Sequence, residues 1–277
     1  MSRTATIERK TGETRVNLTL DLDGGPVEAS TGVGFLDHML DLLGRHAGIG
    51  LKIDATGDLE TGAHHTVEDV GIVLGQALDQ ALGDRAGIRR YGHAAVPMDE
   101  ALGTCAIDVS GRPFCLFESQ LPPVSIAGFD TELAEEFFRA VANNARITLH
   151  VGTSYGSNAH HMIEACFKAF ARALREAVAI DPDEPRPMRE LARAMNCDAS
   201  YVTAMVDDLE RAGYAERQVA QTDRRVKTVV LTPKGQEALH TVENELLAPP
   251  DQLAQLPTPE RDSLARLLRL ALQIDDH

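Results

Sequence analysis

The stretch His64-His65-Thr66-Val67-Glu68 returns later in the chain as His160-His161-Met162-Ile163-Glu164. On an α-helix, the first His and the Glu of each motif lie four residues apart and the second His and the Glu three apart, so all can share one edge. The two adjacent His side chains point about 100° apart. One motif can therefore give a His and a carboxylate to one metal ion and its other His to a second ion.

The ligand types narrow the choice of metal without deciding it. Imidazole and carboxylate groups without thiolate suit manganese, iron, cobalt or zinc. A single motif of this kind reads equally well as a polar helix edge with satisfied histidines, because short motifs also match by chance. Two copies of so rare a pattern favour the metal interpretation.

The repetition extends beyond the two motifs. Phe35 to Ile53 superposes on Leu133 to Val151 without a gap, with apolar and acidic positions in register. Both segments predict an amphipathic helix followed by a short alternating strand, and each leads into its HHxxE helix. The superposition places His38 opposite Glu136. We infer that these two residues are equivalent additional ligands; the alternative is that both are exposed polar residues of a helix.

The remaining patterns predict the class of fold. Alternation from Thr4 to Leu22 indicates a β-hairpin, Val27 to Ser30 a returning strand, and two strand-like runs surround Ser110-Gly111-Arg112-Pro113. Two helices and roughly four short strands in each half indicate an α+β fold, in which duplicated half-domains pack helices on one face of a mixed sheet.

Composition excludes several classes of protein. The 277 residues carry a net charge of −15, which argues against broad nucleic-acid binding by the whole surface. No apolar run approaches a membrane span, and the first residues lack the apolar segment of a signal peptide, so we expect a cytoplasmic protein without a membrane partner. The four cysteines show no CxxC spacing and are interpreted as ordinary thiols.

Several segments carry a family resemblance. FLDHML, GDLETGAHHTVED, GIRRYG, PMDEAL, SGRPF, TLHV and HHMIEACFKAFARALR resemble imidazoleglycerol-phosphate dehydratase of histidine biosynthesis, from about Thr4 to Pro182. The resemblance implies the duplicated fold, a homo-oligomer of 24 subunits with metal sites shared between chains, and manganese as the ion, two per subunit. It also implies imidazole glycerol phosphate as the substrate and loss of water to imidazole acetol phosphate as the reaction.

Two metal ions on the imidazole ring would stabilise the charge that develops as a carbon-bound proton leaves. The predicted metal ligands of both halves are His38, His64, His65, Glu68, Glu136, His160, His161 and Glu164. His46 and His150 are interpreted as structural or supporting residues, because the repeat pairs them with Asn144 and Lys52.

Catalysis also needs a base and groups that hold the substrate. The base must reach the carbon-bound proton, and the natural candidates are a carboxylate near the metal, Glu68 or Glu164, or Glu13 of the N-terminal hairpin. The sequence leaves the choice among them open. Glu13 also counts among the substrate-binding residues. Arg90 and Arg112 match positions where the family holds substrate and phosphate, as bidentate guanidinium chemistry favours; the alternative is that they are ordinary surface arginines. Asp99 is expected to orient such a group, and the alternative is that it caps a helix or turn.

The long helix from Ala159 to Ala179 also carries three basic residues, Lys168, Arg172 and Arg175. We interpret them as a solvated or inter-subunit face.

The chain changes character after Ile180. Residues 1–181 form the predicted dehydratase-like domain, 182–187 a proline-rich linker and 188–277 a partial winged helix region. The Ser-Thr-Lys or Ser-Ser-Lys element with which the family helps hold the substrate phosphate is replaced.

The last region reads as a helix, a turn, a second helix and a basic-tipped hairpin, which is the order of a winged helix-turn-helix. DASYVTAMVDDLERAGYAERQVAQTDRRVKTVVLTPKG resembles MarR-type transcriptional regulators, without that family's N-terminal dimerisation helices. The DNA-contacting residues that this resemblance implies are Ser200, Thr203, Arg224 and Arg225.

Two other interpretations of the whole chain stay open beside the hydro-lyase. One is a DNA-binding regulator that uses the dehydratase part as an oligomeric or ligand-sensing scaffold. The other is a chimera formed by recombination or design, in which the winged helix region is a relic.

Overall fold

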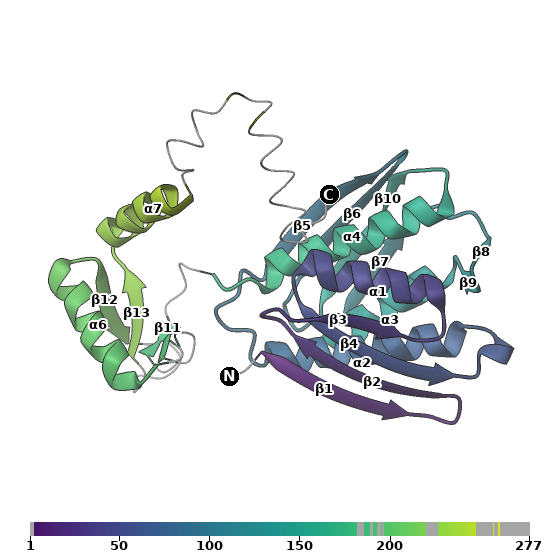
Figure 1. The fold of residues 1–277 in the computed structure, drawn as a ribbon, viewed down its shortest axis with the longest axis horizontal. Coiled ribbons are helices and arrows are strands. Elements are labelled where there is room, and N and C mark those ends of the chain that lie inside the picture. Colours follow the sequence, from purple (N-terminus) through teal and green to yellow (C-terminus); the bar gives the residue numbers. More distant parts are fainter. Residues whose placement is uncertain are drawn as a thin grey trace. The chain divides into compact units, whose positions relative to one another are not determined.

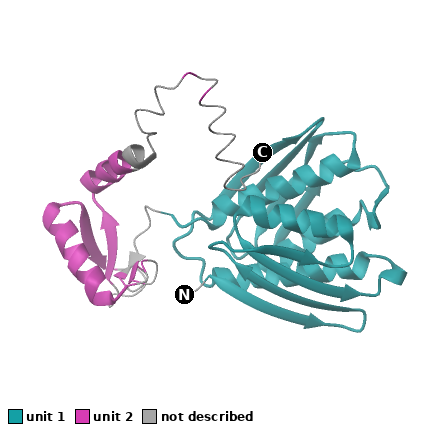
Figure 2. Ribbon diagram, in the orientation of Figure 1, with its two compact units in different colours: residues 1–184 teal, residues 185–277 magenta. Residues whose placement is uncertain are grey.

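A computed structural model describes residues 3–181, 186–188, 191–192, 195, 197–219, 227–247, 257 and 260. The chain divides into two compact units, residues 1–184 and 185–277 (Figure 2). Each unit is described by itself.

The first half of unit 1 is a four-stranded sheet with two helices. Its strands have the spatial order β1-β2-β4-β3, in which β3 and β4 run parallel and the other pairs antiparallel. The elements are β1 (Thr4–Lys10), β2 (Thr14–Asp21), β3 (Val27–Ser30), α1 (Gly34–Ala47), β4 (Gly50–Gly57), the 3₁₀ turn η1 (Leu59–Thr61) and α2 (His64–Leu82).

The second half repeats this arrangement. Its sheet has the order β5-β6-β10-β7, again with one parallel pair, β7 with β10. The elements are β5 (Tyr91–Met98), β6 (Ala101–Asp108), β7 (Phe114–Glu118), the small hairpin β8 (Ser125–Ile126) and β9 (Phe129–Asp130), α3 (Leu133–Ala145), β10 (Thr148–Tyr155) and α4 (Ala159–Val178). The predicted α+β fold of duplicated half-domains is confirmed.

The helices of the two halves pack crosswise. Helix α1 contacts α4 of the other half, and α2 contacts α3, while α2 and α4 also cover the strands of their own sheets (Figure 1). Glycines allow the close approach of α2 and α3, because a Cβ at Gly71 or Gly75 would lie within 2.9 Å of main-chain atoms of α3. The halves therefore share one core rather than forming separable domains.

Phenylalanines fill the centre of the second half. Phe137, Phe138, Phe167 and Phe170 are fully buried, and the Phe138 ring lies 4.8 Å from that of Phe167 and 5.9 Å from that of Phe117. The strands alternate, with one side chain toward this core and the next toward the outer face, as in β2 and β6.

One part of the second sheet differs from the sequence prediction. The two expected runs around Ser110–Pro113 are preceded by a strand that begins at Tyr91, and the tight β5–β6 turn lies at Asp99 and Glu100. Asp99 adopts a φ of 47°, a left-handed conformation that Asp tolerates better than most residues. No glycine marks this turn, so the sequence pattern missed it.

Unit 2 includes, among its described residues, a small three-stranded sheet of order β11-β13-β12. Its described elements are β11 (Arg186–Pro187), α6 (Ala199–Ala212), β12 (Ala215–Val219), β13 (Lys227–Leu231) and α7 (Pro233–Leu247). Arg186 and Pro187, which the sequence assigned to the linker, pair with Val229 and Thr228. The predicted basic tip of the hairpin, with Arg224 and Arg225, lies outside the described residues.

Within the described part of the chain, no helix combines the length and the apolar character needed to cross a membrane.

Candidate metal centre

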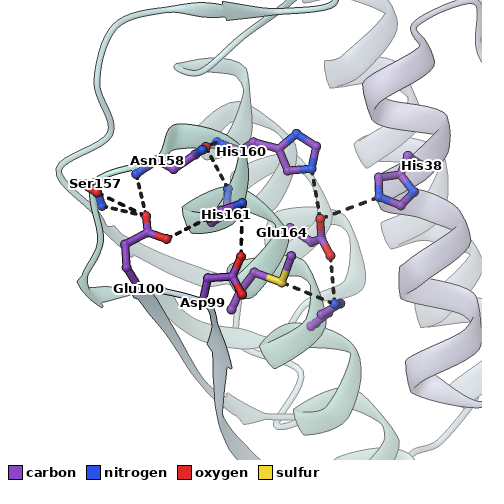
Figure 3. A network of polar contacts seen from close by, with 10 residues as sticks. His38, Asp99, Glu100, Ser157, Asn158, His160, His161 and Glu164 are labelled. Atoms are coloured by element: carbon purple, nitrogen blue, oxygen red, sulfur yellow. Dashed lines mark hydrogen bonds and ion pairs between the residues drawn. The ribbon is translucent and has the colours of Figure 1, made fainter. Parts of the chain in front are cut away.

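One group of three predicted ligands comes together in unit 1 (Figure 3). His38 of α1 and His160 of α4 place their Nε2 atoms 3.7 Å and 3.1 Å from Oε2 of Glu164. Donor atoms that share an ion at about 2.1 Å lie about 3 to 4 Å from one another, so the group fits a metal ion with small adjustments. Two imidazoles and a carboxylate suit a manganese, iron, cobalt or zinc ion.

Lys168 controls the charge of the carboxylate in this group. Burial disfavours the charged form of Glu164, but the Lys168 ammonium at 2.8 Å and His160 outweigh it, so the pKa of Glu164 is lowered. The prediction of a solvated or inter-subunit face is wrong for Lys168, whose side chain is 15% exposed, whereas Arg172 and Arg175 are exposed. Position Lys168 is one helical turn after Glu164, which is the signal that could have revealed it.

The start of α4 is fixed by two side chains. Asn158 is the N-cap and accepts hydrogen bonds from the backbone N–H groups of His160 and His161. Glu100, from the β5–β6 turn, accepts from the backbone N–H of Asn158 at 2.7 Å and of Ser157 at 3.1 Å. The tip of the hairpin is thereby attached to the end of the helix that carries the second motif.

His161 points away from the group of three. Its Nδ1 lies 2.7 Å from Oε2 of Glu100, and its Nε2 lies 3.6 Å from Asp99 (Figure 3). The hydrogen bond to His161 and those from the backbone hold the pKa of Glu100 down at about 2, and Glu100 in turn raises the pKa of His161.

The first motif is built differently at the start of α2. Nδ1 of His65 lies 3.1 Å from both carboxylate oxygens of Asp58, which raises the pKa of His65. The Glu13 carboxylate on the β1–β2 turn is exposed and adds to this rise through its charge. His64 is exposed and Glu68 is half-buried.

Glu136 is not gathered with the first motif in this chain. It forms an ion pair of 3.1 Å with Arg139 on its own helix. Among the described residues, only the His38 group has three ligand atoms close enough to share an ion. The crosswise packing nevertheless gives the two positions matching surroundings, since α1 packs on α4 and α3 packs on α2.

The two predicted substrate arginines meet at one carboxylate. Arg90 donates to Asp108 at 2.7 Å and 3.2 Å, and Arg112 approaches the same carboxylate at 3.5 Å. The hydrogen bond from Arg90 lowers the pKa of Asp108, which therefore stays charged and holds both guanidinium groups side by side. The exposed pair is suited to bind an anion bidentately.

These arginines lie far from His160 and the rest of the His38 group of the same chain. The backbone N–H of Arg90 donates to Ala177 at the end of α4, whereas His160 begins that helix. At 1.5 Å per residue, the two ends are about 25 Å apart. Asp99 lies at the opposite end of the β5–β6 hairpin from Arg90 and contacts His161, so it does not meet these arginines within one chain. Its predicted role of orienting a substrate-binding group stays a prediction.

Comparison with known proteins agrees with this geometry. The family profile described as imidazoleglycerol-phosphate dehydratase matches residues 31–174. The chain belongs to the imidazoleglycerol-phosphate dehydratase family. A dehydratase of this name from Geobacter metallireducens is 58% identical over 183 residues, covering 66% of this chain and 94% of the relative. The dehydratase from Rhodopseudomonas palustris strain TIE-1 is 60% identical over 181 residues, covering 65% of this chain and 92% of that relative.

The fold of the dehydratase family is matched as well. The crystal structure of the Staphylococcus aureus dehydratase is 45% identical with a TM-score of 0.59, over 64% of this chain and 99% of that one. Both the resemblance stated from the sequence and its fold are thus confirmed.

The region after the dehydratase part matches a second profile. The profile described as MarR family matches residues 180–227. Of the residues predicted to contact DNA, Ser200 and Thr203 are exposed near the start of α6, where the Thr203 hydroxyl donates to the carbonyl of Ala199. Arg224 and Arg225 lie outside the described residues.

Proposed function

We propose that this chain dehydrates imidazole glycerol phosphate to imidazole acetol phosphate in histidine biosynthesis. The observation that carries the proposal is the His38, His160 and Glu164 group, in a chain of the dehydratase family. We further propose that the enzyme holds two manganese ions per subunit, bound by the eight predicted ligands, and acts in the cytoplasm as a closed particle of 24 subunits.

In the proposed reaction, different side chains would hold the metal ion, accept the proton and contact the substrate. A bound metal ion would supply Lewis acidity toward the imidazole of the substrate. Both oxygens of Glu164 face partners, Lys168 on one side and two histidines on the other, which leaves it poorly placed to accept a proton. The exposed Glu13 and the half-buried Glu68 are therefore better candidates for the base. Asp99 faces the space beside Nε2 of His161 and would contact what that nitrogen binds.

The phosphate would be held by the paired arginines. Three carbons separate the phosphate ester of this substrate from its imidazole ring, which is far shorter than the length of α4. One substrate molecule therefore reaches the arginines of one chain and the metal ligands of another. This supports an assembly in which the site lies between copies.

Removing one arginine should weaken substrate binding. Arg112→Ala is expected to raise KM by about 10- to 100-fold, because a hydrogen bond to a charged group contributes about 1.5–3 kcal/mol. The value of kcat should change less, since the phosphate does not take part in the proton transfer. Steady-state kinetics on both values tests this, with Arg15→Ala, an exposed arginine paired only with Glu8, as the control. Equal KM values for the two variants would contradict the phosphate role.

The activity itself can be tested with the whole chain. Purified protein loaded with manganese should convert imidazole glycerol phosphate, and its gene should restore growth of a histidine auxotroph that lacks the dehydratase. Because the usual Ser-Lys tail is replaced, we expect a raised KM. Folded, metal-loaded protein that shows no turnover and no complementation would refute the proposed function.

A second candidate, a DNA-binding regulator, is favoured by the MarR profile match. The described part of α6 offers mixed support, because exposed Ser200 and Thr203 near its start are followed by Asp207, Asp208 and Glu210. A gel shift with the upstream region of the gene, repeated with Arg224→Ala and Arg225→Ala, tests this function. Absence of a shift at low and high salt would dispose of it.

A further inference from the structure

The second histidine of each motif meets a carboxylate through Nδ1. His65 meets Asp58 at 3.1 Å, and His161 meets Glu100 at 2.7 Å. A charged carboxylate can only accept, so the imidazole must donate, and Nδ1 carries the proton. The neutral ring then presents the lone pair of Nε2, which is the form a metal ion binds.

The two carboxylates do not correspond in the repeat. Asp58 directly follows β4, next to the motif of its own half, whereas Glu100 comes from the β5–β6 turn. The equivalent turn of the first half lies between β1 and β2 and carries the exposed Glu13. Among the described contacts, Glu13 forms no hydrogen bond with His65. Two different parts of the chain thus supply the same contact to the same atom. Duplication of an ancestral half does not explain why both histidines meet a carboxylate at Nδ1, because the two carboxylates come from different positions of the repeat. A need for a carboxylate at Nδ1 of this histidine does explain it.

We propose that Asp58 and Glu100 are positioning residues for metal binding: they fix the tautomer and direction of His65 and His161 so that Nε2 can bind a metal ion. The inference rests on the proposed metal-dependent function. Carboxylates behind metal-bound histidines generally act in this way, and their loss weakens metal binding about 10- to 100-fold.

Glu100 has a geometry that makes the inference sharply testable. Its Oε1 accepts from two backbone N–H groups, those of Ser157 and Asn158, while Oε2 faces His161. In Glu100→Gln, the amide oxygen must stay with the two backbone donors. The amide NH₂ then faces Nδ1, which must become an acceptor, so the proton moves to Nε2 and blocks the metal-binding atom.

Asp58 provides a matched comparison within the proposal, because its carboxylate meets fewer fixed donors than that of Glu100. Both of its oxygens lie 3.1 Å from Nδ1 of His65. The Thr61 hydroxyl donates to Oδ2 but also lies 2.9 Å from the main-chain oxygen of Asp58. In Asp58→Asn, the amide oxygen can therefore keep the hydrogen bond from Nδ1 while Thr61 turns to the main chain.

The experiment measures manganese affinity by calorimetry on the full chain and the histidine tautomers by imidazole nitrogen shifts in NMR of the metal-free protein. We expect Glu100→Gln to lose about 10- to 100-fold in affinity and to protonate Nε2 of His161. Glu100→Ala should lose less affinity, because the His161 imidazole then has no partner that forces its proton onto Nε2. Asp58→Asn should also lose less than Glu100→Gln, because its amide oxygen can keep the hydrogen bond from Nδ1 of His65. A purely structural role of Glu100 predicts the reverse, with Ala the worst.

Helix α4 keeps its Asn158 N-cap in all these variants, and circular dichroism checks that it still forms. Unchanged manganese affinity together with an Nδ1-protonated His161 in Glu100→Gln would overturn the inference. If the unsubstituted protein itself binds no manganese, the proposed function fails, while the tautomer measurement still decides whether Glu100 and Asp58 set the protonation of the two histidines.

Discussion

Glu164→Gln is expected to lower kcat by about three orders of magnitude and to empty the His38 group of metal. Glu164 supplies the one carboxylate of the group, and its Oε2 faces both histidines. A neutral amide is a weak metal ligand. Loss of the metal's charge stabilisation is worth several kcal/mol, and each 1.36 kcal/mol is about tenfold in rate.

The measurement combines elemental analysis with steady-state kinetics. The amide keeps the shape of the side chain and an oxygen for Lys168, so thermal unfolding should show a folded protein. Glu132→Gln, an exposed glutamate at the start of α3, serves as the control for a change of charge. A Glu164→Gln enzyme with full metal content and near-normal kcat would show that the group of three is not the working metal site.

Phe138→Ala is expected to destabilise unit 1 by about 3–5 kcal/mol, which is the usual cost of truncating a buried aromatic side chain. Phe138 is fully buried, and its ring contacts those of Phe117, Phe137, Phe167 and Phe170. Since Phe167 and Phe170 lie on α4, the cavity would also loosen the helix that carries the second motif.

Denaturant unfolding at fixed protein and metal concentrations measures this loss, because assembly and metal both shift apparent stability. The comparison is Phe114→Ala on the outer face of the second sheet, whose side chain is 52% exposed. We expect a change of at most about 0.5 kcal/mol there, as for most surface substitutions. Similar losses in the two variants would show that the aromatic cluster is not the centre of the core.

Much of the fold can be predicted from the sequence, because the spacing of apolar residues differs between helices and strands. Strand Val27–Ser30 is predicted with the bounds that the structure has, and the ungapped superposition reveals the duplication. The β5–β6 turn was missed, because Asp99 adopts its left-handed conformation without a glycine to mark it. Such a turn depends on the neighbouring strands rather than on its own residues.

The sequence predicts those parts of the site whose residues lie close together along one helix. His160 and Glu164 are four residues apart on one helix, so the motif alone places them together. Glu100 and His161 are 61 positions apart and meet only because the hairpin tip folds over the start of α4. Lys168 looks like a surface lysine in the sequence, because the contact of its Nζ with Met98, 70 positions earlier, depends on the packing of β5 against α4. The separation of Arg90 from His160 likewise follows from the course of the chain rather than from any motif.

In the proposed assembly, this separation along α4 makes each substrate molecule a bridge between two chains. Such a molecule would bind the arginines of one chain and the metal ligands of a neighbouring chain. Its binding would therefore favour associated chains over separate ones. By reciprocity, the free energy with which substrate strengthens association is the free energy with which association strengthens substrate binding. In that proposed assembly, the apparent affinity of the enzyme for its substrate would depend on the concentration of the enzyme, and dilution would weaken binding without altering a single residue.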